Sequence, residues 1–137
     1  MADIILHRDT ATGKTNAINP SRHISFVIDG GGSAIAVGMK GYVGPFPFPM
    51  NVKEVHLQCD VSGQIEVDIL KHSHLSGILS SDETISSGSR PGTAGSSKYH
   101  DANLSSWVKT ISSGDIIGFN VTSAETVTKC TVGLWLQ

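Results

Sequence analysis

The chain has 137 residues, of which 16% are charged, and its formal net charge is −2. This length indicates one domain, and the abundance of glycine, serine and threonine favours short strands joined by tight turns over helices. The scattered lysines and arginines form no basic stripe, so we do not expect nucleic-acid binding. A signal-peptide pattern and a membrane-spanning apolar run are both lacking, which predicts a soluble protein made in a cytoplasm, without a membrane partner.

Residues 1–22 differ in character from the rest of the chain. After a short apolar patch the segment is polar and rich in turn-forming residues, without sustained periodicity. This composition is typical of an extended arm rather than of a core element. The apolar side chains of Ile4, Ile5, Leu6 and Ile18 would be out of place on a solvated tail. We therefore expect the arm to dock on a partner through these four residues.

Strand patterns follow the arm. We expect a strand over Ile24–Asp29, a turn at Gly30–Gly32 and a second strand over Ala34–Val43 that is interrupted by glycines. The proline-rich Gly44–Met50 segment is expected to be an extended edge or crossover, because proline cannot donate a ladder hydrogen bond.

Two adjacent segments, Val55–Val61 and Ile65–Ile69, alternate strictly between apolar and polar residues. Each therefore has the pattern of a half-buried antiparallel strand. A three-residue loop between them would place Cys59 opposite Val67 and keep the buried face uniformly apolar, whereas a two-residue turn would mix polar and apolar residues. We therefore predict that these segments pair as a β-hairpin.

The second half of the chain is expected to be loop-rich over residues 73–103, followed by strands at Val108–Ile111, Asp115–Thr122 and Thr126–Gln137. About eight strands and no helix predict an all-β, antiparallel, jelly-roll-like sandwich. We assign this β-sandwich domain to residues 23–137.

The alternation also predicts which side chains are buried. Trp135 should point away from the core and form a subunit contact, and Glu66 and Asp68 should lie on the solvated side of their strand. Cys59 and Cys130 should be buried free thiols, although a disulfide between them remains an alternative. The predicted core face consists of Val55, Leu57, Cys59, Val61, Ile65, Val67, Ile69, Phe119, Val121, Val132 and Leu134.

Motifs for catalysis or cofactor binding are incomplete. Thr12–Thr15 is similar to the end of a phosphate-binding loop, but Arg8 stands where that loop needs a glycine. His72 and His74 share one side of an extended segment, yet no third metal ligand is evident, and we expect two exposed histidines. We therefore expect no enzymatic activity, no cofactor and no metal centre.

Four segments carry a resemblance to a known family: the Phe26–Gly32 opening, the Ser62–Gly63 turn, the Trp107–Asp115 stretch and the Val121–Thr128 closing hairpin. Together they resemble a small β-sandwich domain found in virion proteins of tailed bacteriophages, both as a stand-alone head or tail protein and as a fibre module. The resemblance covers nearly all of the chain after the arm. It implies a structural role in the virion, and its motifs supply no catalytic residue.

Two functions are compatible with this resemblance. The first is a capsid decoration (cement) protein that binds the major capsid protein between subunits, forms a homotrimer and is assembled into the virion in the host cytoplasm. The second is a tail-fibre or receptor-binding module that holds a host surface glycan with Trp107, Tyr99 or Trp135 and the loop at residues 73–103.

Overall fold

The computed structural model of the chain describes residues 5–8, 15–18, 21–74 and 83–137. None of these residues is helical, so the described part of the chain contains no helix able to cross a membrane. The strands are β1 (Ile5–Arg8), β2 (Thr15–Ile18), β3 (Arg22–Asp29), β4 (Gly38–Val43), β5 (Met50–Cys59), β6 (Ile65–Ser73), β7 (Lys98–Asp101), β8 (Thr110–Ile111), β9 (Asp115–Ala124) and β10 (Lys129–Leu136).

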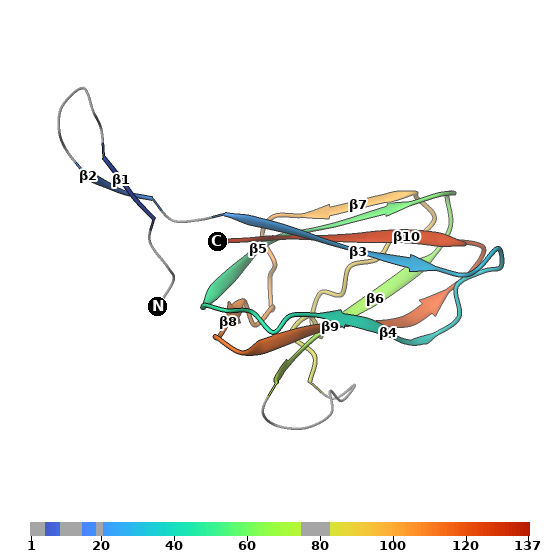
Figure 1. The fold of residues 1–137 in the computed structure, drawn as a ribbon. Coiled ribbons are helices and arrows are strands. Elements are labelled where there is room, and N and C mark those ends of the chain that lie inside the picture. The colour runs from blue at the N-terminus through green and yellow to red at the C-terminus, as the bar shows by residue number, and fades with distance from the viewer. Residues whose placement is uncertain (1–4, 9–14, 19–20, 75–82) are drawn as a thin grey trace.

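Eight of the strands form two facing sheets (Figure 1). One sheet has the order β3-β10-β5-β7, with β8 pairing with the start of β5, and the other has the order β4-β9-β6. All pairs are antiparallel, and β3, β4, β5 and β6 alternate between the two sheets, as do β9 and β10. This arrangement confirms the predicted all-β, jelly-roll-like sandwich.

The predicted hairpin between β5 and β6 is wrong. These strands lie in different sheets, where β5 pairs with β10 and β7 while β6 pairs with β9. Strict alternation shows which face of a strand is buried, but two strands that face each other across a sandwich have the same pattern as two paired neighbours. Val61, predicted to be in the core, lies in the connection between the sheets and is 44% exposed.

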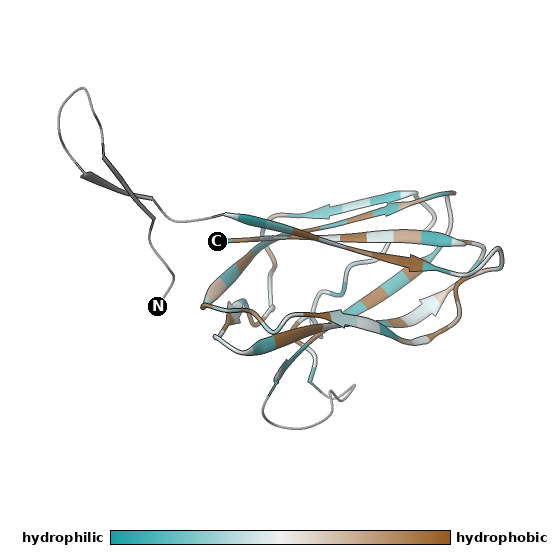
Figure 2. Ribbon diagram, in the orientation of Figure 1, coloured by the Kyte–Doolittle hydropathy of each residue, from teal (hydrophilic) through white to brown (hydrophobic). Residues whose placement is uncertain are grey.

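The other ten residues of the predicted core face are buried. Figure 2 shows the alternation of hydrophobic and hydrophilic residues along these strands. Phe26 of β3 and Phe119 of β9 join the two layers, because their rings stack with centroids 4.5 Å apart. Gly41 permits this contact, since a Cβ atom there would lie 2.6 Å from Cζ of Phe26 and its φ of 152° is unfavourable for other residues.

Several strands differ in their bounds from the predictions, and β7 was not predicted. β4 begins at Gly38 rather than at Ala34. β7 lies within the segment that was expected to be a loop. Its sequence, KYHD, has no apolar alternation, so the sequence does not indicate a strand there. The strand forms because β5 provides its hydrogen-bonding partner. The three strands predicted after residue 107 are confirmed as β8, β9 and β10, although β8 begins at Thr110 rather than at Val108 and β10 at Lys129 rather than at Thr126.

Asp68 corrects the expectation of a solvated face on β6. Its side chain is buried, at 2% exposure, and accepts hydrogen bonds from the hydroxyls of Thr84 and Ser86, the latter at 2.8 Å. Nε of Arg90 lies 3.4 Å from its second oxygen. The segment that carries these partners, residues 83–92, runs along β6 and forms isolated bridges with Glu66 and Leu70. Its hydroxyls bury a side chain that alternation alone assigns to solvent. Glu66 is half-buried.

The N-terminal arm contains an element that the sequence did not predict. β1 and β2 pair as a two-stranded antiparallel hairpin, with Ile5 opposite Ile18 and Leu6 opposite Ala17. Neither strand pairs with any other described strand, and Figure 1 shows the hairpin apart from the sandwich, ahead of β3. Ile4 lies outside the described residues. The docking role of the arm and its boundary at residue 22 stay predictions.

Candidate functional site

The outer face of the β3-β10-β5-β7 sheet carries a cluster of ring-bearing side chains and one carboxylate. We call it the histidine face and define it by His23 of β3, Trp135 of β10, Glu54 and His56 of β5, and His100 of β7. Because side chains alternate across a strand, these residues point away from the core that their neighbours fill. The cluster therefore lies on four strands that are adjacent in space but distant in sequence.

Strand register brings the five residues together. Trp135 lies opposite His23 on one side and Glu54 on the other, and His56 lies opposite His100. A register shift beside Trp135 marks a β-bulge in β5, an irregularity that is common next to functional sites.

Gly133 provides the space for the imidazoles. It lies opposite His56 in the register of β10 and β5. A Cβ atom at this position would lie 3.0 Å from Nε2 of His23 and 3.7 Å from Cβ of His56. A larger residue would therefore displace His23 and crowd His56.

Aromatic contacts order the cluster. The rings of His56 and His100 stack with centroids 4.5 Å apart and an interplanar angle of 11°. Trp135 lies 5.2 Å from His56 and meets His23 edge-on at 6.2 Å. The indole nevertheless remains 45% exposed, which agrees with its predicted outward orientation.

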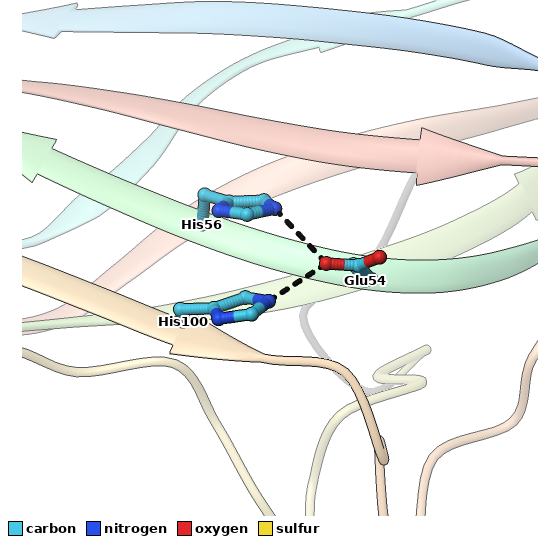
Figure 3. Close-up of side chains that lie close together, drawn as sticks. All are labelled: Glu54, His56 and His100. Carbon is cyan, nitrogen blue, oxygen red and sulfur yellow. Dashed lines mark hydrogen bonds and ion pairs between the residues drawn. The ribbon is translucent and has the colours of Figure 1, made fainter.

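Glu54 lies at the end of the stacked pair, where one carboxylate oxygen faces both imidazoles (Figure 3). Nε2 of His100 donates a hydrogen bond to Oε1 of Glu54 at 2.7 Å, and Nε2 of His56 lies 3.4 Å from the same oxygen. Nε2 of His56 is shielded from solvent and makes no hydrogen bond within the described part of the chain. Such a group of one carboxylate and two imidazoles can share a proton or ligate a cation.

A hollow of about 370 Å³ borders the histidine face. Arg22, His23, Lys53, Glu54 and Trp135 contribute to its lining. It therefore offers one exposed aromatic face next to side chains of both charges.

The structure brings together only some of the site residues predicted from sequence. Trp135 lies on the histidine face, whereas Ile5, Leu6 and Ile18 lie in the β1–β2 hairpin. Their role in partner binding stays a prediction.

Trp107 is not available to a glycan. It is buried in the core and its Nε1 donates a hydrogen bond to the carbonyl of Ser89 at 2.9 Å. Tyr99 is half-buried and packs against the core. Of the three aromatic residues considered for glycan binding, Trp135 is therefore the one exposed on the surface.

The His72–His74 pair also differs from the expectation of two exposed histidines. His74 is exposed, but His72 is buried and its Nδ1 bonds to Glu83. Glu83 belongs to the same segment, residues 83–92, whose hydroxyls bury Asp68 on β6.

The two cysteines are direct neighbours, with Cys59 of β5 opposite Cys130 of β10. Both are free and buried, as the first of the two sequence interpretations proposed. Burial raises the pKa of both thiols, so they remain protonated and unreactive at neutral pH.

Sequence reasoning missed Glu54, His56 and His100 as a group. Alternation correctly places His56 on the polar side of its strand, but nothing local connects it with His100. The signal that joins them is the pairing of β5 with β7, and β7 has no strand pattern of its own.

Comparisons with known proteins add little to this description. No protein-family model and no curated protein matches the chain. A solved structure of the Gx strain of infectious bursal disease virus is similar at a TM-score of 0.37 and 10% sequence identity. The similarity covers 99% of this chain, which spans 37% of the length of the viral chain. At this level the likeness carries no functional conclusion.

Proposed function

We propose that the protein is a virion structural protein of a tailed bacteriophage, and specifically a decoration (cement) protein that stabilises the head by binding between capsid subunits. The sequence resemblance described above supports the virion role. The observation that carries the binding role is a set of exposed apolar side chains on two edge strands, β3 and β4, and directly before β4. We call it the edge patch, and its members are Val27 (59% exposed), Val37 (63%), Met39 (40%) and Tyr42 (63%).

The edge patch lies where a β-sandwich is most open to association. β3 and β4 each pair with a single described neighbour, so each has a free edge. Proteins protect such edges with charges, prolines or covering segments, and an apolar edge favours association with another chain. Large apolar residues at these edges therefore support a partner surface rather than a solvated one.

Closed assembly would cover this surface without producing filaments. A homotrimer would match the three-fold positions of an icosahedral shell, and the N-terminal arm would reach the neighbouring major capsid protein. In this proposal Ile4, Ile5, Leu6 and Ile18 anchor the arm, and the protein joins the virion in the host cytoplasm. It has no catalytic activity.

Two measurements test the proposal. The full-length chain should sediment as a trimer and bind purified empty heads of its phage, whereas a chain lacking residues 2–20 should stay folded and no longer bind them.

Tyr42→Ser should weaken the trimer, while Val108→Ser, a change at an exposed position outside the edge patch, should not. Full head occupancy by the truncated chain would overturn the role of the arm, and absence of head binding by the intact chain would overturn the decoration role.

A second candidate function is a tail-fibre or receptor-binding module for a host glycan. The specific support is the exposed face of Trp135 beside a hollow lined by charged side chains, since aromatic faces with adjacent polar groups suit sugar rings. Glycan-array binding that Trp135→Ala abolishes would favour this function over decoration. Head binding that survives the same substitution would favour decoration.

A further inference from the structure

We propose that Glu54, His56 and His100 bind a divalent transition-metal ion, with Zn²⁺ as the reference case. Two imidazole nitrogens and a carboxylate oxygen are a ligand set that zinc accepts in proteins, with the fourth position left to water or to a group from a partner. The ligand atoms of all three residues lie within 4.8 Å of one another. This site does not depend on the proposed virion function.

The backbone holds the ligands close before any ion arrives. His56 and His100 are directly opposite on the antiparallel strands β5 and β7, and Glu54 is two residues from His56 on the same face of β5. Cross-strand neighbours have Cβ atoms about 4.5–5.5 Å apart, which suits two imidazoles on one ion. Neither histidine therefore depends on a flexible loop for its position.

The distances are close to those of a coordinated ion. Zinc bonds of about 2.0–2.1 Å in a tetrahedron place neighbouring ligand atoms about 3.4 Å apart. The contact between His56 and Glu54 is 3.4 Å, and that between His100 and Glu54 is 2.7 Å, the length of a hydrogen bond. Binding thus requires the N–H···O bond to be replaced by two bonds to the ion, with the stacked rings tilting toward each other.

His100 can make this movement, because its side chain is 56% exposed. His56 is more enclosed, between the ring of His100 and the indole of Trp135. Its Nε2, shielded from solvent, lacks a hydrogen bond among the described residues, although it faces the carboxylate of Glu54. A metal ion beside Glu54 would provide this nitrogen with the partner that it lacks.

The test uses full-length protein without an affinity tag, prepared free of metal and titrated with zinc chloride by calorimetry. We expect one ion per chain at micromolar affinity, and binding at least about tenfold weaker in His100→Ala and in Glu54→Gln. His74→Ala is the matched control, since it removes an exposed histidine that directly follows β6, a strand of the other sheet, and should leave binding unchanged.

Spectroscopy locates the ion independently. Cu²⁺ bound at this site should quench the fluorescence of Trp135, which contacts His56, and His100→Ala should remove the quenching. Thermal unfolding of each variant confirms that it is folded. The proposal is wrong if the wild-type chain binds no zinc at micromolar concentration, or if folded His100→Ala and Glu54→Gln variants bind it as tightly as the wild type.

Discussion

Replacing Asp68 with alanine should destabilise the sandwich strongly, although the sequence pattern places this residue in solvent. The carboxylate is buried and accepts hydrogen bonds from the hydroxyls of Thr84 and Ser86. A hydrogen bond to a charged group contributes about 1.5–3 kcal/mol, so loss of the two would cost about 3–6 kcal/mol. Arg90 is partly exposed and its ion pair adds little. Removing the charge also recovers part of its desolvation cost, which leaves an expected loss of about 2–4 kcal/mol.

Equilibrium urea unfolding, followed by the fluorescence of buried Trp107, measures this loss. Asp68→Asn should fall between the wild type and Asp68→Ala, because the amide retains one acceptor oxygen but not the charge. Glu125→Ala provides the control, since it removes an exposed carboxylate and should change the free energy of unfolding by less than about 0.5 kcal/mol. If Asp68→Ala changes stability as little as Glu125→Ala, the buried network does not hold residues 83–92 against β6.

Three further predictions concern the sandwich itself. Leu57→Ala should lower the free energy of unfolding by about 2–5 kcal/mol, because the residue is fully buried, whereas Val61→Ala should change it by less than about 0.5 kcal/mol in the same urea titration. The thiol of Cys130, whose pKa is raised by burial, should resist a thiol reagent at pH 8 until the protein unfolds, so rapid labelling of folded protein would contradict its burial. The pKa of Asp60 is lowered, chiefly by its hydrogen bond from Thr128. The stability difference between wild type and Asp60→Asn should therefore be full at pH 6 and shrink as the pH falls below about 4 toward the folded-state pKa. A difference as large at pH 2 as at pH 6 would refute this assignment.

The buried faces could be predicted from sequence because alternation is a local property. Leu57 and Val132 were placed correctly from their own segments, and both are buried. Strand pairing is not local. Whether the chain after Cys59 turns back to pair with β5 or passes to the other sheet depends on which strands pair with the two edges of β5. β10 and β7 occupy those edges, so β6 pairs with β9 in the other sheet.

The candidate site was harder to predict for the same reason. Trp135 was identified as exposed because its neighbours in β10 are apolar and face inward. Its contact with His56 and the approach of His100 to Glu54 arise from pairings between strands far apart in sequence. The local sequence around a polar strand residue does not predict which residue of the neighbouring strand lies opposite it.

The edge patch and the histidine face each include an outward-pointing residue of β3, Val27 and His23 respectively, but they share no residue. A partner that covers the edge patch would therefore lie near the histidine face but would not have to contact the metal-ligand atoms of Glu54, His56 and His100. Tyr42→Ser should weaken assembly and leave zinc affinity unchanged, whereas His100→Ala should weaken zinc binding and leave the trimer intact. If instead each substitution impairs both properties, the two surfaces belong to one interface, and the ion bridges chains rather than residing within one.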